Sequence, residues 1–262
     1  FIATTLVGLW PVARQALRLM KSGSWFAIET LMSVAAIGAL FIGATAEAAM
    51  VLLLFLMSYQ LAGDTAHEWL GVAMFVAFIV HHILNRRWIA GIIKGKYSVM
   101  RVIQTVLAIV ILLCMACSMI SGVLLSNHLF TFIRVRGVAA TARRMHMICA
   151  YWGFVFMSLH LGIHWNMVVR MAGKCFKNPS ALRSIVAKTL AAVVAVYGIR
   201  AFIKREIGSY MLLKIHFVFF APQESLLLFI LDYMAVMALF VWIGYYGSRC
   251  INQFTRKGIK ER

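Results

Sequence analysis

The architecture of this chain follows from HEWLGVAMFVAFIVHHILNRRW (67–88), an apolar run that is long enough to cross a bilayer. A second stretch, RRMHMICAYWGFVFMSLHLGIHW (143–165), repeats its pattern. In each stretch two histidines lie fourteen residues apart: His67 and His81, then His146 and His160. On an α-helix fourteen residues rise about 21 Å and return to within about 40° of the same face. Each helix therefore offers one imidazole near each side of a membrane, both on one face.

The composition of the whole chain indicates several membrane spans. Of 262 residues 63% are hydrophobic and only 13% are charged, and the mean hydropathy is +0.88. A water-soluble domain does not need so much apolar surface, whereas helices of about 20 residues in a bilayer do. This composition predicts an all-α, polytopic transmembrane bundle, and the two histidine pairs predict that it has a cytochrome b-like four-helix core. The helices are expected at about 67–88, 99–125, 144–169, 182–200 and 225–248, with Asp64 or Thr65 capping the first.

Two other segments are less regular. Residues 26–61 are apolar and form either two short helices with a turn near Gly43 or one long tilted helix. Residues 201–222 are expected to be a short re-entrant or interfacial piece.

The net charge of +18 comes from short basic clusters between the apolar runs. Positive residues gather in this way at membrane edges, where they set topology and meet anionic lipid. We therefore expect membrane lipid as a partner and no nucleic acid, since no separate basic domain is present. Lys and Arg number fifteen in the connections 86–101, 170–188 and 249–262, against eight in 134–144 and 200–214. The positive-inside rule then predicts a multi-pass membrane protein with a cytoplasmic C-terminus.

With that topology, helices 67–88 and 144–169 run parallel, and the histidines form two levels. We predict two b-type haems, one ligated by His67 and His146 and the other by His81 and His160, because a low-spin haem iron takes two neutral imidazoles. Two alternatives stay open: His82 adjoins His81, and His164 lies one turn beyond His160, so either can replace its neighbour.

Small and basic residues accompany these histidines. Gly71 and Gly153 lie on the ligand-bearing faces, where a missing side chain gives a macrocycle room; close helix packing explains each glycine equally well. Arg143 and Arg144 precede His146, either to pair with haem propionates or as interface anchors.

The double-histidine blocks, together with IGSYMLLKIHFVFF (207–220), resemble the bacterial flavinylation-associated cytochrome family over about residues 56–250. The resemblance implies a membrane cytochrome b that passes electrons between a quinone or redox partner and extracytoplasmic flavin-bearing proteins. Such a chain is an electron-transfer subunit of an oxidoreductase, not a complete enzyme.

The N-terminal part resembles a different family. FAIETLMSVAAIGALFIGATAEAAMVLLLFL (26–56) is similar to the first membrane hairpin of zinc/cadmium/lead-exporting P-type ATPases, and residues 1–21 to the preceding platform helix. Glu47 falls on an acidic position of the ion pathway in those pumps. No phosphorylation loop or nucleotide-binding sequence is present, so we expect no ATPase activity from this chain. We therefore predict two domains, residues 1–61 and 62–262.

Two other hypotheses compete with the di-haem cytochrome. In the first, the chain is a transition-metal membrane protein, a zinc transporter fragment or an accessory subunit, in which Glu29, Glu47 and the same histidines are ligands. In the second, it is a structural or assembly subunit whose histidines pair with neighbouring polar groups.

Overall fold

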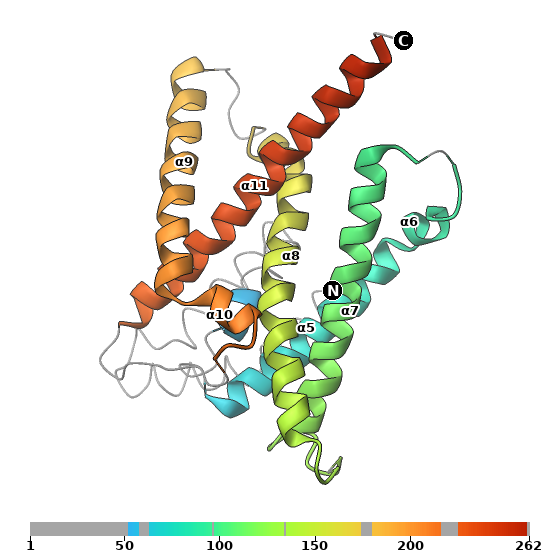
Figure 1. Ribbon diagram of the computed structural model, residues 1–262, viewed down its shortest axis with the longest axis vertical. Coiled ribbons are helices and arrows are strands. Elements are labelled where there is room, and N and C mark those ends of the chain that lie inside the picture. Colours follow the sequence, from blue (N-terminus) through green and yellow to red (C-terminus); the bar gives the residue numbers. More distant parts are fainter. Residues whose placement is uncertain are drawn as a thin grey trace. The chain divides into compact units, whose positions relative to one another are not determined.

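The structure is a computed structural model that describes residues 52–57, 63–95, 97–133, 135–173, 180–215 and 225–260. All regular structure in those ranges is helical: residues 52–57, α5 (Asp64–Leu84), α6 (Arg86–Gly91), α7 (Val99–Leu125), α8 (Ala139–Gly173), α9 (Ala181–Lys204), α10 (Ile207–Met211) and α11 (Leu226–Lys260) (Figure 1). The prediction of an all-α, polytopic helical protein is confirmed.

Five of the described helices are long and apolar enough to cross a membrane: Asp64–Leu84, Val99–Leu125, Ala139–Arg170, Ala181–Lys204 and Leu227–Thr255. Large apolar side chains are exposed along them; Leu113 is 58% and Val196 is 67% exposed. In water such surfaces promote aggregation, whereas in a bilayer they contact acyl chains. The chain is a multi-pass membrane protein in contact with lipid.

The first predicted span differs from the structure at both ends. α5 begins at Asp64, after Gly63 with φ 78°, and no side chain caps it, so the prediction of Asp64 or Thr65 as the cap is wrong. A glycine at positive φ turns the chain sharply enough for the helix to start one residue later. At the other end the helix stops at Leu84 instead of Trp88, because Asn85 departs from helical backbone angles with φ −96° and ψ 14°. Its backbone amide and its Nδ2 both donate to the His81 carbonyl, at 3.0 and 2.8 Å.

The predicted interfacial piece after α9 is partly visible. α9 ends at Lys204, Glu206 adopts a left-handed conformation with φ 50°, and the short α10 follows. Residues 216–224 lie outside the described residues, as do 1–51, Glu29, Glu47 and the predicted domain boundary at 61/62.

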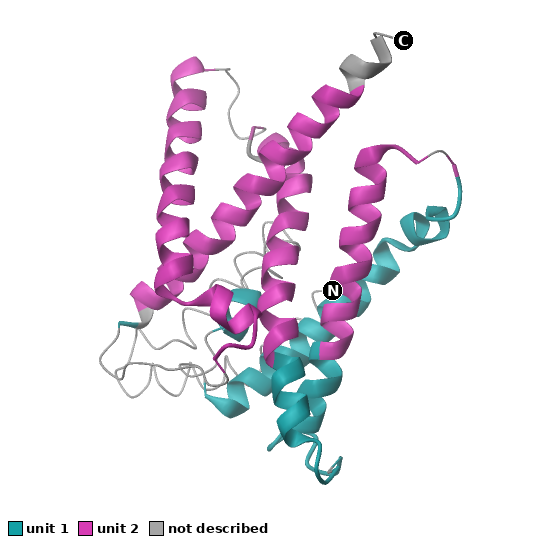
Figure 2. Ribbon diagram, viewed as in Figure 1, with its two compact units in different colours: residues 1–94, 118–146, 219–226 teal, residues 95–117, 147–218, 227–262 magenta. Residues whose placement is uncertain are grey.

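The chain forms two compact units (Figure 2). Unit 1 comprises Phe1–Lys94, Ser118–His146 and Phe219–Leu226, and unit 2 comprises Gly95–Cys117, Met147–Val218 and Leu227–Arg262. Two helices are shared: α7 passes from unit 2 into unit 1 at Ser118, and α8 passes from unit 1 into unit 2 at Met147.

Glycines let helices of unit 2 cross closely. A Cβ added at Gly162 of α8 would lie 2.4 Å from the Val241 carbonyl oxygen of α11, and one at Gly244 would lie 2.5 Å from the Leu159 carbonyl oxygen. α9 approaches α11 in the same way, because a Cβ at Gly198 would lie 2.4 Å from the Ala235 carbonyl oxygen. Small residues at helix crossings are typical of membrane bundles, where backbone packing replaces the hydrophobic effect between helices.

The interior of unit 2 is filled around these crossings. Phe154 and Val236 are fully buried, and Tyr151 stacks on Tyr210 of α10 with ring centres 4.8 Å apart. Trp152 Nε1 donates to the Met211 carbonyl at 3.0 Å, which further ties α10 to α8. These contacts hold the α9–α10 connection in place beside the middle of α8.

Candidate functional site

Two predicted ligands, His67 and His146, face each other within unit 1. Their ring centres are 6.0 Å apart and the rings are inclined by 72°. Zinc binds an imidazole nitrogen at about 2.0–2.1 Å, so two rings on one ion can have centres about 6 Å apart. The two rings are therefore neighbours, close enough to share one metal ion, while their predicted role as ligands stays a prediction.

The ring of His146 is oriented by α7. Its Nδ1 lies 2.9 Å from the Ser118 carbonyl oxygen and 3.3 Å from Ser121 Oγ. A carbonyl can only accept, so Nδ1 carries the proton and donates, which leaves the lone pair on Nε2. A metal-binding histidine commonly has its second nitrogen fixed in this way. Gly122 makes room for the ring, since an added Cβ would lie 3.3 Å from His146 Cε1.

Next to His67, the Glu68 carboxylate binds the start of the connection between α7 and α8. Oε2 accepts from Ser126 Oγ at 2.7 Å and from the Leu129 amide at 2.8 Å, and Oε1 accepts from the Asn127 amide at 2.7 Å. A carboxylate that accepts this many hydrogen bonds has a structural role and is not a metal ligand, because its lone pairs are already used. The sequence analysis missed this role, because nothing in the local pattern links Glu68 to residues about sixty positions away.

The other predicted histidines are distributed over both units. His82 Nδ1 lies 2.9 Å from the Phe78 carbonyl oxygen, one turn back on its own helix, so that ring is held locally. The rings of His160 and His164 have centres 4.8 Å apart. His81 belongs to unit 1 and His160 to unit 2. Their pairing at a second level, and with it the choice among these four histidines, stays a prediction.

The glycines and arginines that were predicted to accompany the histidines are not closely packed. A Cβ added at Gly71 would meet nothing within 4 Å, and one at Gly153 would touch only Cys114 Cβ at 3.7 Å, an ordinary contact. Arg143 and Arg144 are exposed. The glycine that accommodates a histidine ring is Gly122, which lies on the neighbouring helix and not on the histidine's own face.

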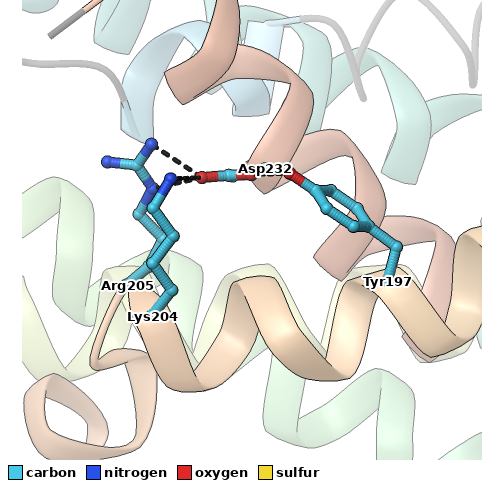
Figure 3. Close-up of polar contacts among 4 residues, drawn as sticks. All are labelled: Tyr197, Lys204, Arg205 and Asp232. Carbon is cyan, nitrogen blue, oxygen red and sulfur yellow. Dashed lines mark hydrogen bonds and ion pairs between the residues drawn. The ribbon is translucent and has the colours of Figure 1, made fainter.

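A second polar cluster lies in unit 2 around Asp232, whose side chain is only 1% exposed. Its Oδ1 accepts from the Tyr197 hydroxyl at 2.6 Å. Its Oδ2 accepts from Lys204 Nζ at 2.9 Å and from Arg205 Nε and Nη2 at 2.9 and 2.7 Å. The two basic residues reach the carboxylate from one side and Tyr197 from the other (Figure 3). The cluster joins α9 to α11.

The sequence carried one signal for this cluster. Asp232 interrupts the apolar run LLLFILDYMAV (226–236), and an ionisable residue inside a membrane span is costly unless it has a partner. The basic pair at the end of α9 supplies partners of opposite charge. Only the fold shows that they meet.

Comparison with curated proteins finds relatives of one segment of the chain. A 66-residue segment of the chain is 86% identical to the zinc/cadmium/lead-transporting P-type ATPase of Escherichia coli (strain K12), and equally to that of Shigella sonnei (strain Ss046). The segment makes up 25% of this chain. The chain therefore matches only 9% of the length of these relatives. No family model matches the chain, and no solved structure matches it.

This match confirms the resemblance to P-type ATPases and overturns the main functional prediction. The prediction of a di-haem cytochrome b that passes electrons across the membrane is wrong, because the segment match points to metal transport instead. The equal histidine spacing constrains only four positions, and imidazoles also serve as hydrogen-bonding groups inside membrane helices. The resemblance to flavinylation-associated cytochromes gains no support, nor do a quinone or flavin-bearing partner. Haem b stays a prediction from spacing alone.

Proposed function

We propose that the chain is a fragment of, or an accessory to, a membrane transporter of divalent transition-metal ions such as zinc, and that it hydrolyses no ATP itself. The observation that carries the proposal is the 66-residue segment with 86% identity to ATPases that transport zinc, cadmium and lead. Identity at that level over a membrane segment supports shared ancestry. The five apolar spans supply the membrane setting that a transporter needs.

The imidazoles of His67 and His146 are the best candidates in the described residues for contact with such an ion. Their ring centres are 6.0 Å apart, and the hydrogen bond from His146 Nδ1 leaves the lone pair on Nε2. Imidazole is a ligand that zinc prefers. Within the residues described, no group of three metal-ligating side chains comes together. Two protein ligands bind an ion weakly, which suits a path along which the ion must also leave.

The orientation in the membrane follows from charge. The connections that contain Arg86, Arg183 and Arg249 carry fifteen Lys and Arg, against eight in the alternate connections. Because positive loops stay on the cytoplasmic side, we infer a bacterial inner-membrane protein with a cytoplasmic C-terminus.

The experiment is a zinc titration of the full chain, purified in detergent, with bound metal measured by elemental analysis after equilibrium dialysis. His67→Ala and His146→Ala each remove one imidazole, and we expect each to weaken zinc binding by at least about tenfold. His128→Ala is the matched control, because His128 is exposed in the same unit and only its backbone amide contacts Glu68.

Equal zinc affinity in all four proteins would contradict the assignment of the imidazole pair. Absence of zinc binding by the unmodified chain would contradict the proposed function itself.

A further inference from the structure

One face of α9 carries a shallow groove that the proposed metal function does not use. The groove has a volume of about 460 Å³ and is lined by Val196, Ile199, Arg200, Ile203 and Lys204. These positions follow the spacing i, i+3, i+4, i+7 and i+8, so they lie on one side of the helix. The apolar members are strongly exposed: Val196 67%, Ile199 51% and Ile203 69%.

Positive charge gathers at the C-terminal end of this groove. Arg200 is exposed and forms no hydrogen bond or ion pair within the part of the chain that the structure describes. The Lys204 side chain is 50% exposed even though its Nζ donates to Asp232 at 2.9 Å.

Arg205 differs from these two, because its side chain is 10% exposed and both of its ion-pairing nitrogens bind Asp232. Asp232 is therefore neutralised chiefly by Arg205. Counting the exposed Glu206 as well, residues 200–206 with Asp232 hold three basic and two acidic groups, a net charge of +1. Arg200 and the half-exposed Lys204 both line the groove.

We propose that this groove binds one anionic phospholipid, with its phosphate at Arg200 and Lys204 and an acyl chain along Val196, Ile199 and Ile203. The apolar walls of the groove match the acyl chain of a phospholipid, and the two cations match its phosphate. The Asp232 cluster prepares the site, since it holds the Lys204 stem against α11 while half of the side chain stays accessible. Lys and Arg side chains near a membrane surface attract anionic headgroups.

The alternative ligand with the same headgroup chemistry is free phosphate. The groove walls argue against it, because three of the five lining residues are aliphatic and offer nothing to a small hydrated anion. The following experiment distinguishes a bound phospholipid from bound free phosphate.

The test is native mass spectrometry of the full chain in detergent, with phosphatidylglycerol and phosphatidylethanolamine of identical acyl chains added in equal amounts. The unmodified chain is expected to retain phosphatidylglycerol preferentially. Arg200→Gln should lower that preference about fivefold, because one basic group near a membrane surface contributes on that scale. Lys188→Gln is the matched control, since Lys188 is exposed on the same helix and lies outside the groove.

Arg200 is exposed and forms no hydrogen bond or ion pair within the described residues, so Arg200→Gln should keep the thermal unfolding temperature of the unmodified chain, which confirms that the variant is folded. The proposal would be overturned if Arg200→Gln and Lys188→Gln preferred phosphatidylglycerol equally. It would also be overturned if the unmodified chain showed no preference for phosphatidylglycerol. Displacement of the bound lipid by millimolar inorganic phosphate would also overturn it, in favour of a free-phosphate site.

Discussion

At Asp232 a single carboxylate holds together three side chains that the sequence places 27 to 35 residues away. It sits inside the apolar run of α11, where an unpaired charge would cost several kcal/mol. Tyr197, Lys204 and Arg205 supply four donors, and the Arg205 guanidinium also lies 4.7 Å from the centre of the Phe229 ring. The free energy of this cluster depends on the negative charge, because that charge compensates the two cations.

Replacing Asp232 by Asn tests this dependence. The amide keeps the shape but removes the negative charge that pairs with Lys204 and the nearly buried Arg205, so we expect the chain to lose about 2–4 kcal/mol of unfolding free energy. The measurement is thermal or denaturant unfolding in detergent. The matched control is Asp64→Asn at the chain's only other aspartate, which is exposed at the start of α5. Equal stability of the two variants would mean that the ion cluster adds nothing.

At the scale of single residues, the sequence predicted some side-chain contacts and missed others. It placed His67 and His146 together because the fourteen-residue period follows from helix geometry and the parallel direction of the two helices follows from the distribution of basic residues. It did not predict Gly122 beside the His146 ring or the four donors on Glu68. Those contacts depend on how one helix is rotated against another and on the path of the 126–129 connection, neither of which has a local signature.

At the scale of elements, the helices of unit 2 pack through glycines. Gly162 and Gly244 lie at the crossing of α8 with α11, and Gly198 lies where α9 meets α11. Each is so close to a neighbouring carbonyl oxygen that a methyl group cannot be added without moving a backbone. Such close approach also brings Tyr197 of α9 within hydrogen-bonding distance of Asp232.

We predict that Gly162→Ala destabilises the chain by about 1–3 kcal/mol, because the added methyl group forces α8 and α11 apart. Gly247→Ala is the control within α11, since a Cβ there meets nothing within 4 Å and alanine favours the helix. The unfolding temperatures of the two variants in the same detergent give the comparison. A Gly162→Ala variant as stable as Gly247→Ala would show that the crossing tolerates separation.

The existence of the spans was predictable and their ends were not. The 99–125 prediction coincides with α7 because a long run without charges leaves no other choice in a bilayer. α5 stops at Leu84 because the backbone angles of Asn85 are not helical, and α8 extends beyond 144–169 at both ends. Helix ends are decided by single hydrogen bonds, whereas spans are decided by the summed hydropathy of about twenty residues.

At the scale of the whole molecule, one chain joins a segment that is nearly identical to part of a metal-transporting ATPase with five apolar spans in the described residues. The sequence suggested both a cytochrome and a metal transporter, and periodicity favoured the first. Four histidines in two matched pairs are consistent with either metal, because iron in haem and zinc both accept imidazole. Only similarity over many positions separates these possibilities, and it supports metal-ion transport.

The most direct test of metal-ion handling is elemental analysis of the purified full chain after equilibrium dialysis against zinc, combined with a visible absorbance spectrum before and after dithionite. We expect zinc or another divalent transition-metal ion, no iron and no Soret band, and loss of the bound metal in the His67→Ala and His146→Ala double variant. Stoichiometric iron with a Soret band and no zinc would contradict the account.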